Sequence, residues 1–192
     1  MPDFDPDAAI SARKRRPPPI ATPAHLRTVA EAYVQRFFGP AANLRRVLLR
    51  HVDRSVREHG TDRGASLREI ELIVGQFAES KLLDDRRFAE LAARTLHGRG
   101  RPRQVIGMQL RAKGLGEADV GAALANLDTE ALSDRDAAWA LARRRRLGPY
   151  RRIERKAFRE KDLQAIARAG FSFSLAREVV DAAETDAAGE AS

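Results

Sequence analysis

The regular spacing of the apolar residues constrains the fold of this chain more than any other feature of the sequence. Between residues 23 and 183 they recur every three or four positions, as in Leu26, Val29, Tyr33 and Phe37, and no stretch alternates over the length of a useful strand. Glycine, proline or a helix-capping residue interrupts this pattern at short intervals. Because such a period places apolar side chains on one face of a helix, the sequence predicts an all-α fold.

Three serines mark expected helix starts. Ser66 with Glu69, and Ser133 with Asp136, have the spacing of a capping box, in which the hydroxyl accepts from an amide three residues on and the acid reaches back. Ser174 is expected to cap the last helix in the same way, through its hydroxyl alone. These starts divide the apolar pattern into separate helices.

Two further starts are marked by acids and by proline. Asp84 and Asp85 suit the free amides and the positive dipole end of a helix, so both are interpreted as structural caps. Pro102 is expected at a first helical position and Gly114 at the end of the same helix. The expected helices cover about residues 26–37, 44–56, 66–77, 84–95, 102–113, 117–127, 133–147, 153–169 and 174–180.

Parts of these helices repeat along the chain. RQVIGMQLRAKGL at 103–115 returns as EKDLQAIARAGF at 160–171, and ANLRRVLLRHV at 43–53 is a looser copy. Because one three-helix unit cannot bury all its apolar faces alone, such units are expected to stack around a continuous core. The sequence thus predicts an elongated array of three tandem three-helix units, at residues 23–80, 81–130 and 131–183.

The two ends are expected to lie outside this array as disordered tails. Residues 1–22 form a basic arm, in which Arg13-Lys14-Arg15-Arg16 precedes three prolines that block helix propagation. Small and acidic residues follow from about Asp181, and residues 184–192 are expected to be an acidic tail. The sequence shows no leader-like or membrane-spanning stretch and no cysteine, so a cytoplasmic protein without a membrane partner is expected.

Residue patterns that would support catalysis are missing from the sequence. There is no phosphate-binding loop, no dinucleotide fingerprint and no nucleophile elbow. Adjacent residues such as Asp84 and Asp85 diverge by about 100° on a helix, which does not suit a catalytic carboxylate pair. We therefore expect no enzyme, no metal, no cofactor and no small-molecule substrate. Four histidines lie too far apart to chelate one ion and are interpreted as surface residues: His25, His51, His59 and His97.

Positive charge is concentrated in two blocks. The chain has a net charge of +8, which attracts polyanions. Residues 94–113 hold six basic residues and no acid, around a glycine-flanked loop at a helix start that suits phosphate, and residues 143–161 hold ten basic residues and two acids. The blocks either contact phosphate or an acidic protein surface, or form solvated faces. The candidate contact residues are Arg94, Arg99, Arg101, Arg103, Arg111, Lys113, Arg143, Arg146, Arg151, Arg152, Arg155 and Lys156.

Four consecutive arginines at 143–146 sweep most of a helix circumference, so they cannot all face one partner. Arg144 or Arg145 is therefore expected to lie along the apolar stripe of Leu141, with its stem buried and its charged head at the water.

Residues 81–115, KLLDDRRFAELAARTLHGRGRPRQVIGMQLRAKGL, resemble the RecX family, the bacterial modulators of the RecA recombinase. The end of the chain is similar to the last unit of that family around Gly170 and Phe171, although Ala169 replaces its usual basic residue. Phe38-Gly39-Pro40-Ala41 departs from the serine-glutamate cap of the family's first unit. The residues that carry the resemblance are Leu83, Asp84, Asp85, Arg87, Phe88, Ala89, Arg99, Gly100, Pro102, Leu110, Lys113 and Gly114.

The resemblance implies a regulator that docks along the RecA–DNA filament and damps its ATP hydrolysis, strand exchange and coprotease activity, in DNA repair and the SOS response. A monomer is expected, with single- or double-stranded DNA as a further possible partner. Two alternatives remain. One is a stand-alone DNA-binding protein of helix-turn-helix type. The other is an adaptor that recruits a partner through Arg13–Pro19.

Overall fold

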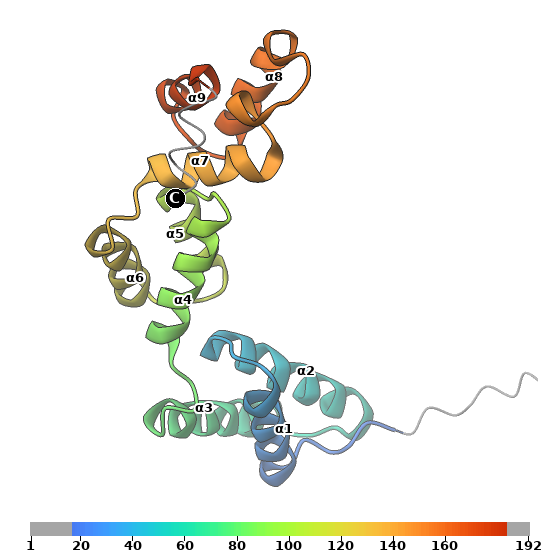
Figure 1. Cartoon of the computed structure of the whole chain (residues 1–192). Helices are drawn as coiled ribbons and strands as arrows, with labels where there is room; N and C mark the ends of the chain where they lie inside the picture. Colours follow the sequence, from blue (N-terminus) through green and yellow to red (C-terminus); the bar gives the residue numbers. More distant parts are fainter. Residues whose placement is uncertain (1–16, 184–192) are drawn as a thin grey trace, which may run out of the picture.

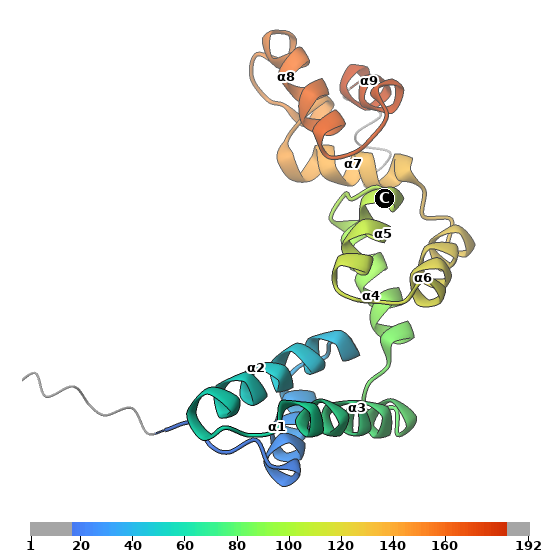
Figure 2. The ribbon, with the colours of Figure 1, turned by 180° about the vertical axis from the view of Figure 1, so that it is seen from behind.

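The computed structural model describes residues 17–183, which fold into helices and contain no strand. The all-α prediction is thus confirmed, and so is the elongated array (Figures 1 and 2). The predicted arm up to Arg16 and the predicted tail at 184–192 lie outside the described residues. The elements are α1 (Pro23–Arg36), α2 (Ala41–His59), α3 (Arg63–Glu79), α4 (Asp85–Gly98), α5 (Arg103–Ala112), α6 (Glu117–Thr129), α7 (Asp134–Arg145), the short 3-10 helix η2 (Gly148–Tyr150), α8 (Arg155–Arg168) and α9 (Phe173–Asp181).

The helices pack in threes around three separate apolar cores. We call α1–α3 unit 1, α4–α6 unit 2, and α7–α9 with η2 unit 3. Leu48 is fully buried in the core of unit 1, Leu110 in that of unit 2 and Ile166 in that of unit 3. The expectation of one continuous core is therefore wrong. The three helices of each unit cover one another's apolar stripes, so little apolar surface is left for the joints between units.

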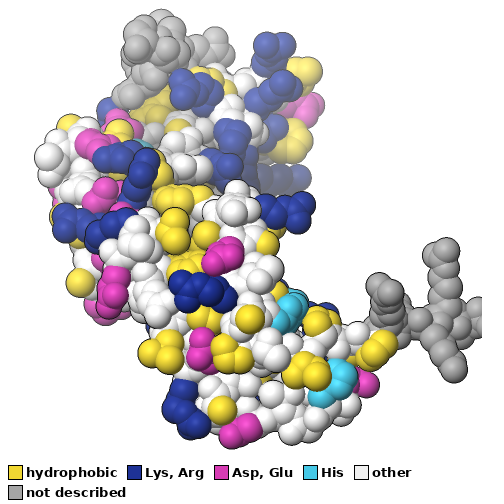
Figure 3. All heavy atoms as spheres, turned by 90° about the horizontal axis from the view of Figure 1, so that it is seen from below, with side chains coloured by type: hydrophobic (Ala, Val, Ile, Leu, Met, Phe, Trp, Pro, Cys, Tyr) yellow, Lys and Arg dark blue, Asp and Glu magenta, His cyan; other side chains and the backbone are white. Residues whose placement is uncertain are grey.

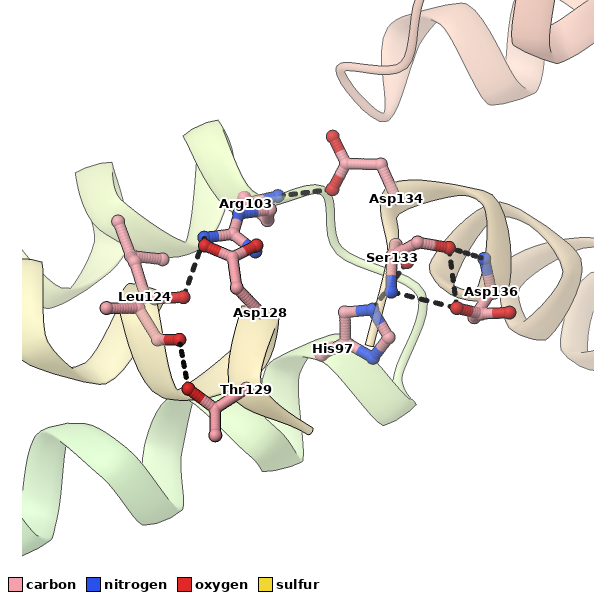
Figure 4. Close-up of polar contacts among 9 residues, drawn as sticks. His97, Arg103, Leu124, Asp128, Thr129, Ser133, Asp134 and Asp136 are labelled. Carbon is pink, nitrogen blue, oxygen red and sulfur yellow. Dashed lines mark hydrogen bonds and ion pairs between the residues drawn. The ribbon is translucent and has the colours of Figure 1, made fainter. Parts of the chain in front are cut away.

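The two joints between units use the same polar contact. Helices α2 and α5 both follow a proline, Pro40 and Pro102, and neither has a side-chain cap within its own unit. A carboxylate from the next unit supplies the missing acceptor. The amide of Ala41 donates to Asp85 Oδ1 at 2.8 Å, and the amide of Arg103 donates to an oxygen of Asp134 at 2.9 Å (Figure 4). Each middle helix is thus capped by the first residue of the following unit.

Two glycines bring the units close together. Gly114 and Gly170 follow the middle helices of units 2 and 3 and have positive φ angles of 86° and 103°. A Cβ on Gly114 would lie 2.5 Å from the Cβ of Ala42, and one on Gly170 would lie 2.7 Å from Val105 Cγ2. Each glycine therefore packs against the first turns of the preceding middle helix. The two segments that the sequence identifies as copies make equivalent contacts, which supports true internal repetition.

Local capping corrects several expected boundaries. The capping box of Ser133 and Asp136 is confirmed, but α3 starts before Ser66, because Asp62 accepts from the amides of Gly64 and Ala65. In the same way Ser172, not Ser174, caps α9, and Pro102 is a cap residue and not the first helical residue. In the first two cases a second suitable capping residue stands a few positions earlier, and the helix extends to it.

The last residues of the predicted arm belong to unit 1. Ala21 is buried in the core of that unit, and its amide donates to Ser55 Oγ at 2.9 Å. The ring nitrogen Nε2 of His59 lies 2.7 Å from the carbonyl oxygen of Pro18. The prediction that the chain stays outside the core up to residue 22 is therefore wrong for these positions. Three prolines block a helix, but they do not prevent an extended segment from packing on α2.

Candidate partner-binding surface

Three acids, two in α6 and one directly after it, neutralise half of the first basic block. Arg94 Nε lies 2.7 Å from Glu130, and Arg111 Nε lies 2.6 Å from Glu117. Arg103 holds Asp128 at 2.8 Å and also donates to the carbonyl oxygen of Leu124 (Figure 4). The guanidinium group of Arg94 lowers the pKa of Glu130, and that of Arg111 lowers the pKa of Glu117. The block has no acid in sequence, yet packing α6 against α4 and α5 supplies three.

Part of the second block is occupied inside unit 3. Arg151 Nη2 lies 2.6 Å from the Asp162 carboxylate, which is buried and also accepts from the amide of Gly148. Arg155 donates to the carbonyl oxygens at the end of α9, and Arg159 pairs with Asp181 at 2.6 Å. The pair with Arg159 lowers the pKa of Asp181. These arginines fasten α8 and η2 to the rest of the unit.

The other predicted contact residues keep their charge available. None of them forms an ion pair with any residue between 17 and 183, and most are exposed. They are Arg99, Arg101, Lys113, Arg143, Arg146, Arg152 and Lys156.

The two blocks meet where unit 2 joins unit 3. Gly100 has a φ of 71°, and a Cβ on it would lie 2.6 Å from the backbone nitrogen and the Cβ of Leu141 in α7. The Arg99–Arg101 turn therefore lies directly against α7, one turn before its arginine-rich end. In Figure 3, Lys and Arg gather along the right-hand edge of the more distant half, whereas along the left-hand edge they alternate with Asp and Glu. We call Arg99, Arg101 and residues 143–146 the joint arginines.

Arg144 and Arg145 differ from their expected placement. They do continue the face of Leu141, but both are exposed, as are their two neighbours at 143 and 146. The core of unit 3 and the close approach of Gly100 bury Leu141, whereas residues 143–146 in the following turn are exposed. The expectation of a buried stem is therefore wrong, and both residues join the available positive charge.

His97 also differs from the sequence interpretation. It is only 4% exposed, and its Nε2 lies 2.7 Å from the Ser133 carbonyl oxygen (Figure 4), so it is a buried residue of the second joint. His25 and His51 are half-buried, with ring centroids 5.5 Å apart. Within residues 17–183 there is no cluster of three or more potential metal ligands, and no helix there is long and apolar enough to cross a membrane.

Sequence reasoning missed a groove beside the joint of units 1 and 2. It has a volume of about 570 Å³ and is lined mainly by aromatic and basic side chains, with no carboxylate among them. Phe37 and Phe38 are more than half exposed there. The available sign was Phe38, which stands directly before Gly39-Pro40 and beyond the expected helix end at residue 37, so that the apolar stripe of this helix does not account for it.

Comparison with known proteins gives a consistent result. The model of the second three-helix domain of RecX matches residues 84–124, which cover α4, α5 and the first part of α6 in unit 2. Regulatory protein RecX of Myxococcus xanthus (strain DK1622) is 39% identical over 178 residues, covering 92% of this chain and 94% of that protein. This chain belongs to the RecX family.

Two further comparisons support the RecX assignment. Regulatory protein RecX of Agrobacterium fabrum (strain C58) is 34% identical over 113 residues, covering 56% of this chain and 59% of that protein. A crystal structure of regulatory protein RecX shares the fold, with a TM-score of 0.57 over 83% of this chain and 72% of that chain, at 23% identity. The RecX relatives are named as regulatory proteins. The Myxococcus match extends over 92% of the chain, so it includes unit 1, where Phe38-Gly39-Pro40-Ala41 departs from the family's usual cap.

Proposed function

We propose that this protein is a non-enzymatic, cytoplasmic regulator of RecA, which binds the RecA–DNA filament as a monomer. It inhibits the recombinase, ATPase and coprotease activities of RecA in DNA repair and the SOS response. The proposal is supported by the membership of the RecX family and by the distribution of positive charge over the three units. An elongated array of similar units suits a periodic partner, since each unit can meet a successive repeat.

The observation that carries the proposal is the meeting of the joint arginines. Arg99 and Arg101 come from unit 2 and residues 143–146 from unit 3, and none has an ion pair within the described residues. Guanidinium groups bind phosphates and carboxylates through paired hydrogen bonds. A surface made by two units also depends on their mutual orientation, so it suits a partner of defined geometry better than a single charged helix would.

The test is DNA-dependent ATP hydrolysis by RecA. We expect equimolar addition of this protein to lower the rate and to shorten RecA filaments. Replacing Arg99, Arg101, Arg144 and Arg145 by glutamate should raise the concentration needed for half-inhibition about tenfold or more, as expected for several lost charge contacts. The matched control carries the same charge change at Arg54, Arg57, Arg68 and Arg87, which lie on other surfaces. Unchanged ATP hydrolysis with the native protein would end the proposal.

Binding to DNA in the absence of RecA distinguishes the proposed RecA regulator from the alternative, a stand-alone DNA-binding protein. A stand-alone DNA-binding protein would bind without RecA, and its affinity would fall by about 0.9 log units per contacted phosphate for each tenfold rise in salt. Fluorescence anisotropy of labelled single- and double-stranded DNA over a salt series measures this slope. Tight binding without RecA, together with no effect on RecA, would favour the alternative. Inhibition of RecA at a salt concentration that abolishes binding to free DNA would support binding to the RecA–DNA filament.

A further inference from the structure

The groove beside the first joint has apolar walls formed by two units. Tyr33 and Phe37 face each other with ring centroids 5.5 Å apart, and Phe38 of unit 1 lies 5.6 Å from Phe88 of unit 2. Phe37 is 59% exposed and Phe38 58% exposed, although phenylalanine is usually buried. The whole groove, with its rim, has a volume of about 570 Å³, which offers space for a few side chains. Such a feature marks an interaction site.

The rim of the groove is positively charged. Arg36, Arg50 and Lys113 line it, and no aspartate or glutamate does. None of the three forms an ion pair with a residue of the described chain. Lys113 therefore belongs to this groove and not to the joint arginines. An occupant that complements both parts needs an aromatic or large apolar side chain flanked by negative charges.

The chain itself contains a segment of that composition. Asp3-Phe4-Asp5-Pro6-Asp7 places one phenylalanine between carboxylates, within the residues that precede the described part. Its three acids equal the three cations of the rim in number. Its single aromatic ring is of the size that the hollow accepts.

The length of the chain allows this segment to reach the groove. Pro17 lies beside His51 and Arg54 of α2, and Val47, seven residues before Arg54, lines the groove, which corresponds to about 10 Å along the helix. Twelve residues lie between Phe4 and Pro17, and the thirteen steps from one Cα to the next span up to about 43 Å when extended. Tethering gives the segment an effective concentration in the millimolar range, so a weak contact is sufficient for occupancy.

We propose that Asp3–Asp7 binds this groove within the same molecule, with Phe4 in the apolar hollow and the aspartates against the cationic rim. The segment then covers a surface shared by units 1 and 2 and excludes other acidic ligands from it. This inference does not depend on the proposed regulation of RecA, because it concerns a different surface and an intramolecular contact.

The absence of cysteine makes a direct test possible on the full chain. A nitroxide on Ala8→Cys broadens the amide signals of residues near it in an NMR spectrum. We expect selective broadening at Gly39, Val47 and Lys113. Replacing Phe4 by Ala and the three aspartates by Asn should remove it, whereas Phe173→Ala, an exposed phenylalanine of unit 3, should not. No broadening at the groove, or broadening that persists without Phe4 and the aspartates, would overturn the proposal.

Two further measurements exclude other occupants. One measurement mixes protein that carries the nitroxide but no ¹⁵N with protein that carries ¹⁵N but no nitroxide. Any broadening in this mixture comes from contact between two molecules. Broadening as strong as within one chain would overturn binding of the segment within the same molecule. A fluorescent peptide of residues 1–10 should bind the Phe4 and aspartate variant about tenfold more tightly than the native chain, whose own segment competes. Equal affinities of the peptide for the native chain and for the variant would contradict the proposal. It would also be contradicted if the peptide did not bind at all while thymidine oligonucleotides displaced the nitroxide-labelled segment.

Discussion

At the scale of single residues, one buried carboxylate holds unit 3 together. Asp162 is 1% exposed and accepts from both the Arg151 side chain and the amide of Gly148. Gly148 starts η2, so the carboxylate ties this turn and the arginine to α8. Its contacts explain why Arg151 is a structural residue, although the sequence shows it only as one charge in a basic block.

We expect Asp162→Ala to lower the free energy of unfolding by about 3 kcal/mol, because it leaves a guanidinium and an amide without their acceptor in a buried site. Chemical denaturation in urea measures this loss. The matched control is Asp181→Ala, which removes the exposed pair with Arg159 and should cost less than about 1 kcal/mol. Similar losses for the two variants would contradict the structural role of Asp162.

A second residue, His51, makes the stability of unit 1 depend on pH. Burial lowers the pKa of His51, and the nearby positive charge of Arg54 lowers it further. An unfolded histidine titrates near pH ~6.5. Between the folded and the unfolded pKa the unfolded chain therefore binds more protons, so the folded state loses stability as the pH falls through this window.

We expect His51→Gln to reduce the loss of stability between pH 7.5 and pH 5.5. Urea midpoints at the two pH values, for the native chain and the variant, measure the difference between them, so that other titrating groups cancel. An unchanged dependence in His51→Gln would show that this histidine does not couple protonation to folding.

At the scale of helices, the capping carboxylates of the joints decide how one unit sits on the next. Asp85 and Asp134 each open a helix of their own unit, while their side chains cap the middle helix of the unit before. The residues before them, Asp84 and Ser133, cap their own helices. The sequence predicts both aspartates at 84 and 85 as caps of one helix, but Asp85 caps another helix 44 positions earlier in the chain.

We expect Asp134→Ala to cost about 1 kcal/mol, the usual value of a lost helix cap, and to loosen the second joint. Hydrogen exchange should accelerate at the first amides of α5, from Arg103 to Ile106. Asp128→Ala is the matched control, because it removes the ion pair of the Arg103 side chain and leaves its backbone amide capped. Equal acceleration in both variants would contradict a specific role for the cap.

The helices also show which contacts can be predicted from the sequence and which cannot. The capping box of Ser133 and Asp136 was predictable because both partners lie within one turn. The partners of Arg94 and Arg103 were not, since Glu130 and Asp128 become neighbours of these arginines only after α6 packs on α4 and α5. An acidic segment between two basic blocks was visible in the sequence, but which block it neutralises depends on the order of helices in space. The available charge at the second joint likewise depends on the approach of Gly100 to Leu141.

At the scale of the whole molecule, separate cores and polar joints are expected to let the three units unfold largely independently. The joints contain single hydrogen bonds, such as that from the amide of Ala41 to Asp85, close glycine contacts, such as Gly114 with Ala42, and the ring contact of Phe38 with Phe88. Such contacts fix geometry but contribute little free energy compared with a buried leucine. Each unit is therefore expected to open largely on its own, as in other repeat proteins.

Leu48→Ala tests this independence. The substitution removes a fully buried side chain of unit 1 and should cost that unit about 3 kcal/mol. Hydrogen exchange followed by mass spectrometry should show faster exchange throughout α1–α3 and nearly unchanged exchange in α7–α9. Leu163→Ala, its counterpart in unit 3, should give the opposite pattern. If either substitution accelerated exchange equally in all three units, the joints would transmit stability along the whole array, and the unit interfaces would have to contribute far more free energy than their contacts indicate.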